Sequence, residues 1–198
     1  MQEARPTAVG SRQVPKVGFR DLALPLELLV AVLLGAIALS VNIGERPLID
    51  WDEATYAQVA HEALGSGHVL DLTWNGAPYV KKPPLLFWMV TASFRMLGES
   101  ERAARLPSVI AGVGTLALIY LIAAPVIGRF GAFLAGLAPL GFYFFIARGG
   151  RECATDAPLI FFSTLAIYAL SRGPQKRSWM ALSGMACGLA IMSKGLAG

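Results

Sequence analysis

Acidic side chains gather at one point in the sequence, at Asp50, Asp52 and Glu53. A carboxylate at a protein surface can orient or deprotonate an acceptor, or stabilise positive charge that develops on a sugar ring. The same residues also suit the first turn of a helix, where Asp50 and Glu53 form a capping box and Asp52 complements the helix dipole. Both the functional and the structural interpretation stand for Asp50 and Glu53. Asp52 has no required structural role, which leaves it available for a functional one.

A second polar segment is ARGGRECATDAP, residues 147–158. Its ionisable residues are Arg148, Arg151, Glu152 and Asp156. Ionisable residues at helix ends inside a membrane bundle cost free energy and usually serve a function, although an Arg151–Asp156 ion pair would explain two of them structurally. If the apolar segments of the chain cross a membrane, this segment returns to the side that carries Asp52. We then expect its ionisable residues to meet Asp52.

Lysines stand at two further points where a lipid phosphate could bind. Tyr79, Lys81 and Lys82 lie directly before an apolar segment, which places cationic groups at the depth of lipid phosphates. Lys194 lies at the end of the last apolar segment. Each lysine could instead be an interface anchor whose side chain snorkels to the headgroups, and we prefer that interpretation for Lys81.

The composition indicates what must position these residues. The chain has 198 residues, of which 55% are hydrophobic and 15% are charged, and its mean hydropathy is +0.56. This balance excludes an ordinary soluble domain and indicates an integral membrane protein. The formal net charge is +4, but no soluble basic face exists to bind nucleic acid, so the basic residues are topology signals or site residues. Cys153 and Cys187 lack metal or redox spacing and are expected to be packing residues.

We predict an all-α membrane protein with five transmembrane helices, because a span needs about 20 residues to cross about 30 Å of hydrocarbon. The apolar segments are residues 22–43, 103–127, 130–147, 157–170 and 179–192. Residues 1–20 are expected to form a disordered, basic, cytoplasmic tail, and residues 21–198 the transmembrane region. We interpret segment 22–43 as a retained anchor; a cleaved signal peptide is the alternative, but the basic region before it is long.

The apolar segment 83–98 decides the topology. If it spanned the membrane, the basic loop 172–177 would lie outside the cell, against the positive-inside rule. We therefore expect an interfacial amphipathic helix there, inside a long outward loop of residues 44–102. The N-terminus is then cytoplasmic, and the polar site faces outward from a bacterial cytoplasmic (inner) membrane.

Two short elements are predicted inside this loop. Apolar residues at helical spacing follow Asp50 until Gly65-Ser66-Gly67, which predicts a surface helix. Residues 69–80 carry an Asn75-Gly76 turn signal, which predicts a small hairpin or extended loop. Asp50-x-Asp52 could hold a divalent cation through its oxygens, but a lone pair of acids is a weak pattern, and we commit to no metal or other cofactor.

Together these pieces resemble the N-terminal part of the GT-C type lipid-linked-sugar glycosyltransferases. The similarity is to the protein O-mannosyltransferase superfamily and its bacterial branch, which includes the lipid A aminoarabinose transferase. It is carried by Asp52-Glu53-x-x-Tyr56, Asn75-Gly76-x-Pro78-Tyr79, Lys82-Pro83-Pro84-Leu85-Leu86-x-Trp88, Arg105-Leu106-Pro107-Ser108, Asp156 at the start of a span, and Ser193-Lys194-Gly195. No single piece is specific, but their order and spacing are.

The resemblance implies a helical bundle that transfers a sugar from a polyprenyl-phosphate donor to a lipid, glycan or protein acceptor. It implies Asp52 as the principal catalytic carboxylate, with Glu53 supporting it and Asp156 joining it. Lys82 would hold the lipid phosphate and stabilise it as it leaves. The other residues expected to bind the donor or its phosphate are Tyr56, Tyr79, Arg148, Arg151 and Lys194.

Two departures and two alternatives accompany the resemblance. Thr55 stands where the aminoarabinose branch commonly has arginine, which argues against lipid A as acceptor. Family members continue with more spans, so we expect this chain to be a fragment. A transporter or flippase would use the ionisable residues as a conduction path, but such sites lie near the midplane rather than at helix ends. The other alternative is an inactive fragment that binds lipid phosphate without turnover.

Overall fold

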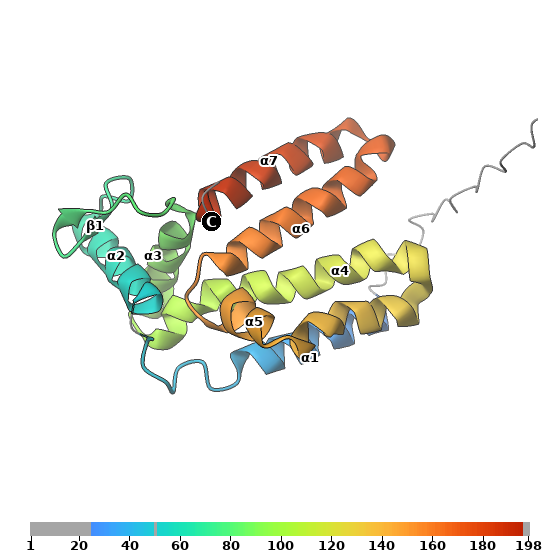
Figure 1. Ribbon diagram of the computed structural model, residues 1–198, viewed down its shortest axis with the longest axis horizontal. Helices are drawn as coiled ribbons and strands as arrows, with labels where there is room; N and C mark the ends of the chain where they lie inside the picture. Colours follow the sequence, from blue (N-terminus) through green and yellow to red (C-terminus); the bar gives the residue numbers. More distant parts are fainter. Residues whose placement is uncertain (1–24, 50, 196–198) are drawn as a thin grey trace, which may run out of the picture.

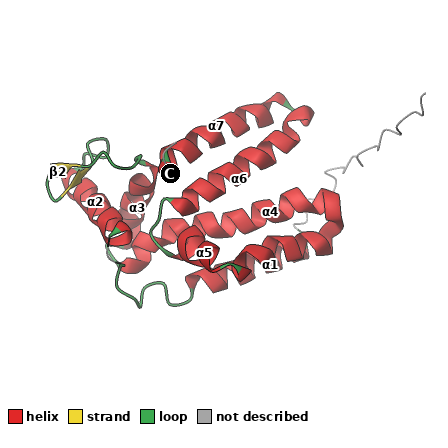
Figure 2. Cartoon of the chain, in the orientation of Figure 1, coloured by secondary structure: helices red, strands yellow, loops and turns green. Residues whose placement is uncertain are grey.

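The part of the chain that the structure describes is mostly helical (Figures 1 and 2), as predicted. The structure is a computed structural model, and it describes residues 25–49 and 51–195. The predicted cytoplasmic tail, residues 1–20, and the predicted capping residue Asp50 lie outside the described residues.

Four long helices lie side by side in Figure 1: α1 (Leu26–Ser40), α4 (Glu101–Leu137), α6 (Asp156–Arg172) and α7 (Arg177–Lys194). Helix α4 packs against both α1 and α6, and α6 packs against α7. A short 3₁₀ turn, Gly173–Gln175, joins α6 to α7. Two further helices, α2 (Asp52–Ser66) and α3 (Leu85–Leu97), lie at one end of this bundle. The outward loop predicted from the sequence therefore folds onto one end of the helices.

Helix α4 turns back on itself at Gly128, whose φ of 74° and ψ of 173° are not helical. The residues after the turn pack against those before it: a Cβ built at Gly136 would lie 3.2 Å from the carbonyl oxygen of Leu116. Buried Tyr120 and Ala132 share one apolar cluster across the same contact. The two apolar segments predicted at 103–127 and from 130 onward are thus both present as helices.

The prediction of one continuous helix from 130 to 147 is wrong. The helix ends at Leu137 and is followed by the 3₁₀ turn Ala138–Gly141, the four-residue helix α5 (Tyr143–Ile146) and a π-helical turn, Ala147–Arg151. Pro139 has no backbone N–H, so it is accepted in the first turn of the 3₁₀ segment but cannot continue the α-helical hydrogen bonds. The sequence is apolar throughout, and hydropathy alone does not register the break.

The helices occupy the predicted apolar segments, but the number of candidate spans is smaller than five. Among the described residues, Glu101–Gly141 is long and apolar enough to cross a membrane, and Tyr143–Arg151 with Asp156–Arg172 makes a second candidate if a pair bent by 95° forms one span. Helix α1 has 15 described residues, a length of about 22 Å at 1.5 Å per residue, which is short of the hydrocarbon thickness.

The elements predicted in the outward loop are confirmed. Helix α2 ends at Gly67, whose φ of 72° is left-handed. Strands β1 (Thr73–Trp74) and β2 (Ala77–Pro78) pair antiparallel around Asn75-Gly76, both of which have positive φ, as a tight hairpin turn requires. Helix α3 buries an apolar face against α2 and α4, formed by Leu86, Phe87, Val90 and Phe94.

Candidate active site

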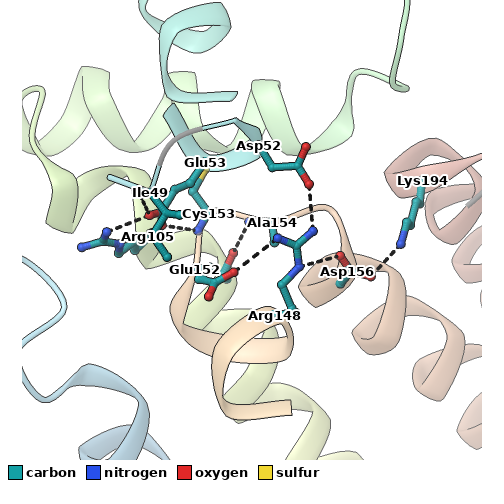
Figure 3. Close-up of polar contacts among 11 residues, drawn as sticks. Ile49, Asp52, Glu53, Arg105, Arg148, Glu152, Cys153, Ala154, Asp156 and Lys194 are labelled. Carbon is teal, nitrogen blue, oxygen red and sulfur yellow. Dashed lines mark hydrogen bonds and ion pairs between the residues drawn. The ribbon is translucent and has the colours of Figure 1, made fainter. Parts of the chain in front are cut away.

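Charged side chains from three parts of the chain meet at the end of the bundle that carries α2 (Figure 3). We call Asp52, Arg148, Glu152, Asp156 and Lys194 the ionic cluster. Arg148 is at its centre: Nη2 lies 2.8 Å from Asp52 Oδ2, Nη1 lies 3.4 Å from Glu152 Oε2, and Nε lies 3.6 Å from Asp156 Oδ2. Lys194 Nζ donates to Asp156 Oδ1 at 2.8 Å. The expected meeting of Asp52 with the 147–158 segment is confirmed.

The π-helical turn Ala147–Arg151 presents Arg148 to the cluster. π-helical turns are rare and often lie at functional sites. This turn rests directly on α4 at Gly112, where a Cβ would lie 2.9 Å from the carbonyl oxygen of Gly149 and 2.9 Å from the Cα of Gly150. Any larger residue at position 112 would push the turn, and Arg148 with it, away from α4.

Helix ends bring Asp156 and Lys194 together. Asp156 is the first residue of α6 and Lys194 is the last residue of α7, and these two helices are antiparallel neighbours. An acidic residue at a helix N-terminus and a basic residue at a C-terminus both complement the helix dipole. The pair therefore has a structural reason to form, and it also places a cation beside the catalytic candidates.

Asp52 is accessible and stays ionised. Its side chain is 48% exposed. The hydrogen bond from Arg148 lowers the pKa of the Asp52 carboxyl below its ordinary value, and the positive charges of Arg148 and Lys82 lower it further, against a smaller opposing effect of burial. An exposed carboxylate with a lowered pKa keeps its negative charge across the physiological pH range.

Glu53, one residue along α2, is buried instead. Its carboxylate accepts from the backbone N–H groups of Ile49 and Cys153, both at 2.8 Å, and from Arg105 Nε and Nη2, both at 2.8 Å. Burial raises the pKa of Glu53, but the hydrogen bonds from Arg105 and the two amides outweigh it, and the pKa is lowered overall. Glu53 therefore ties α2 to α4 and to the loop before α6.

Glu53 does not complete the predicted capping box. Trp51 stands at the N-cap position of α2, with a φ of 81° and no side-chain hydrogen bond to the helix, and Glu53 reaches back to Ile49. The structural interpretation of Glu53 was right in kind, since the residue holds the start of α2 in place. The partner that dominates its surroundings is Arg105, for which no role was predicted from the sequence.

Arg105 could have been noticed from one signal. It is a charged residue within an apolar segment long enough to span, and such residues are paired or functional. Its side chain is 7% exposed. Besides binding Glu53, it donates to three carbonyl oxygens of the chain that leads into α2, those of Ile43, Arg46 and Pro47.

Tyr56, Tyr79 and Lys82 lie around Asp52. Both tyrosines are buried and meet Phe87 edge to face, with ring centroids 5.6 and 5.4 Å away. Burial and the negative charge of Asp52 raise the pKa of each tyrosine. Lys82 is partly exposed and near enough for its charge to act on Asp52.

The two lysines expected to bind phosphate approach each other through their neighbours. A Cβ built at Gly195, directly after Lys194, would lie 3.6 Å from Cγ of Pro83, directly after Lys82. Lys81 takes a different position, with Nζ 5.8 Å from the centroid of the Trp74 ring. Lys82 and Lys194 therefore approach the same end of the bundle, on which the ionic cluster lies.

Arg151 lies apart from this cluster. Its guanidinium donates to the carbonyl oxygens of Ala38, at 2.9 Å, and Val41, at the C-terminal end of α1. A cation there complements the dipole of α1 and satisfies carbonyls that have no partner within the helix. The Arg151–Asp156 ion pair considered from the sequence is therefore wrong, because Asp156 pairs with Arg148 and Lys194 instead.

Neither histidine lies in a metal-binding arrangement in the part of the chain that the structure describes, where no group of three His, Cys, Asp or Glu side chains could hold an ion. His61 pairs with Glu99 through Nδ1. The Asp50-x-Asp52 pattern includes a residue outside the described ranges.

Comparison with known proteins places this arrangement in a family. Residues 81–198 match the family model described as dolichyl-phosphate-mannose-protein mannosyltransferase. The chain belongs to this family. Its resemblance to the GT-C glycosyltransferases, inferred from the motifs, is confirmed.

The similar proteins are much longer than this chain. An uncharacterized protein of Aquifex aeolicus is 30% identical over 161 residues, which are 79% of this chain and 32% of that protein. An undecaprenyl phosphate-alpha-4-amino-4-deoxy-L-arabinose arabinosyl transferase of Pseudomonas savastanoi is 29% identical over 185 residues, 89% of this chain and 33% of that enzyme. The chain thus spans about a third of the length of its curated relatives.

Two crystal structures share the fold. ArnT from Cupriavidus metallidurans in the apo state matches with a TM-score of 0.75, and the same protein bound to undecaprenyl phosphate matches with 0.78. Both are 25% identical in sequence, and the matches cover 86% of this chain and 33% and 32% of those chains.

Proposed function

We propose that this chain is the N-terminal part of a membrane glycosyltransferase that transfers a sugar from a polyprenyl-phosphate donor to a lipid, glycan or protein acceptor. We place the reaction at the outer face of the bacterial cytoplasmic membrane, with five spanning helices and a cytoplasmic N-terminus. The observation that carries the proposal is the contact between Asp52 and Arg148, which joins the outward loop to the start of α6. The undecaprenyl phosphate bound to ArnT supports the choice of donor class.

In the proposed reaction, an acceptor hydroxyl attacks the anomeric carbon of the sugar. The bond between that carbon and the phosphate oxygen breaks, and its electron pair leaves with the lipid phosphate. Asp52 holds the hydroxyl by a hydrogen bond and receives its proton as the new bond forms. Because Arg148 lowers the pKa of Asp52, the carboxylate is a weak base, and orienting the acceptor is the larger part of its role.

Negative charge grows on the phosphate as it leaves, and cations nearby lower the barrier. Lys82 is suited to this, since the described residues place no carboxylate within salt-bridge distance of it. Lys194 and Arg148 are engaged by carboxylates, and we propose that they complete the positive surroundings of the phosphate. Arg151, which caps α1, is left out of the proposal.

The remaining site residues have supporting roles. Tyr56 and Tyr79 pack on Phe87 near Asp52, and Glu53 holds the first turn of α2 through Arg105. Asp156 joins Arg148 and Lys194 in one charge network. The charged residues Asp156 and Lys194 lie at the ends of their helices and not near the middle of them. Transporter sites lie near the membrane midplane, so this placement favours sugar transfer over transport.

The proposal is tested by sugar transfer in membranes, with radiolabelled polyprenyl-phosphate sugars as donors. This chain is compared with a version extended through the downstream reading frame, each alongside its Asp52→Asn variant. Transfer that requires Asp52 supports the proposal, whichever length is active. No transfer by either length, with both inserted in the membrane and several donor sugars offered, contradicts it.

A further inference from the structure

Glu62 has four hydrogen bonds that the catalytic proposal does not use. It lies on α2, and its carboxylate accepts from Gln58 Nε2 at 3.0 Å, Thr73 Oγ1 at 2.6 Å, and the backbone N–H groups of Asn75 at 2.7 Å and Gly76 at 3.3 Å. Three of these donors belong to the β1–β2 hairpin, two of them at its turn. A partly exposed carboxylate satisfied by four donors is a docking point for that hairpin.

The charge of this docking point is stable. The hydrogen bonds from Thr73 and Gln58, with those from the turn amides, lower the pKa of Glu62 to about 2 against an opposing effect of burial. The carboxylate therefore stays ionised at any pH at which the protein works, and each hydrogen bond to it is charge-assisted.

The segment is also held at its two ends. Trp88 Nε1, on α3, donates to the carbonyl oxygen of Val69 at 2.6 Å, before the hairpin. After the hairpin, Tyr79 N donates to the carbonyl oxygen of Leu72 at 2.8 Å, and the Tyr79 ring packs on Phe87. Glu62 fixes the turn between these two points, so the path from the hairpin into the site is held along its length.

This path ends at Lys82, three residues beyond Tyr79, and the positive charge of Lys82 acts on Asp52. We infer that Glu62 is a positioning residue for the lipid phosphate: it holds the hairpin on α2 and thereby fixes Lys82 beside Asp52. The inference rests on the proposed function, in which Lys82 binds that phosphate.

The test measures the binding of undecaprenyl phosphate to the full chain in lipid nanodiscs. We expect Lys82→Ala to weaken binding about tenfold, the range of one charge-assisted contact, and Glu62→Ala to weaken it about three- to tenfold by displacing Lys82. Glu62→Gln is expected to fall between, because its amide oxygen can accept only part of the four bonds. His61→Ala, which breaks an exposed pair one position away on α2, is the matched control and should bind normally.

A double variant separates positioning from a general loss of structure. If Glu62 acts through Lys82, adding Glu62→Ala to Lys82→Ala has no further effect on binding. An equal additional loss in that background, or full affinity in Glu62→Ala alone, overturns the inference.

A second readout does not depend on lipid binding. Trypsin cleavage of the Lys81–Lys82 bond should be faster in Glu62→Ala than in the natural chain and in His61→Ala, because the hairpin is released. If the natural chain fails to bind undecaprenyl phosphate, the donor assignment fails, and the cleavage rates still decide whether Glu62 holds the segment. Unchanged cleavage in Glu62→Ala overturns the inference in either case.

Discussion

Arg148 and Asp52 are 96 positions apart in the sequence, and Arg148 Nη2 donates to Asp52 Oδ2 at 2.8 Å. The contact joins the first turn of α2 to the π-helical turn before α6. It lowers the pKa of Asp52 and gives its Oδ2 a fixed neighbour, while the side chain stays 48% exposed and accessible to an acceptor.

Replacing Asp52 tests this directly. Asp52→Asn removes the charge and the proton acceptor but keeps the shape of the side chain, and we expect sugar transfer to fall by about 10²- to 10⁴-fold. Binding of undecaprenyl phosphate should be retained, because Lys82 is unchanged. Glu45→Gln, an exposed acid in the chain before α2, serves as control. Transfer at the natural rate in Asp52→Asn would remove the residue from the mechanism.

The pH at which the Asp52 carboxyl ionises depends on Arg148. Because the hydrogen bond from Arg148 lowers the pKa of Asp52 in the folded chain, this pair stabilises the fold above about pH 3.9, the ordinary Asp value, and the contribution is lost as the pH falls through the lower folded pKa. Arg148→Met should raise the pKa. Infrared titration of the protonated carboxyl band, assigned with Asp52→Asn, measures it. An unshifted midpoint in Arg148→Met would show that the contact does not control the charge.

The buried Glu53–Arg105 pair should dominate the stability of the outward loop. Arg105→Met leaves the Glu53 carboxylate buried without its main partner, and we expect the free energy of unfolding to fall by about 3–5 kcal/mol. Thermal melting in detergent measures the effect. The control is Arg129→Met, which breaks an exposed pair with Glu27 at 2.7 Å and should leave the melting temperature unchanged. Equal effects in the two variants would contradict this interpretation.

Asp156 and Lys194 should be energetically coupled. Lys194→Met leaves Asp156, which is 6% exposed, with Arg148 alone, at the longer distance of 3.6 Å. We expect a double-mutant cycle of Lys194→Met and Asp156→Asn to give a coupling energy of about 0.5–3 kcal/mol in chemical unfolding. Strict additivity would mean that the ion pair does not stabilise the helix ends.

Local signals in the sequence predicted much of the outward loop. Gly67 ends α2 and Asn75-Gly76 forms the hairpin turn because few residues other than glycine and asparagine adopt these backbone angles at low cost. The approach of Asp156 to Asp52 followed from counting apolar segments and basic loops. Turns and helix ends are determined by residues that are neighbours in the chain, and the placement of apolar segments by their average hydropathy.

What the sequence did not predict depends on partners far along the chain. The sequence left both a capping role and a supporting catalytic role open for Glu53, and its partner Arg105 lies 52 positions away, with no local pattern to connect them. Arg151 was grouped with Arg148 because both lie in the polar segment 147–158, but the π-helical turn separates them, and Arg151 reaches α1 instead. The break after Leu137 was missed because a hydropathy average is blind to a proline in an apolar run.

The orientation of the chain in the membrane is the last prediction. Cysteines are introduced singly at Asp71, in the outward loop, and at Ser178, at the start of α7, both of which are exposed. The exposed natural thiol, Cys187, is first replaced by serine, while the buried Cys153 is kept. Positive charge is retained preferentially on the cytoplasmic side, and the basic loop at 172–177 directly precedes Ser178.

With five spans, a membrane-impermeant maleimide added to intact cells should label Asp71→Cys and not Ser178→Cys. After the cells are opened, both should react, which shows that Ser178→Cys is accessible once the reagent reaches the cytoplasm. Labelling of both in intact cells would instead place α7 and the basic loop on the outer side. That result would make the segment at 83–98 a span, and it would remove α3 from the surface on which the ionic cluster is proposed to meet its substrates.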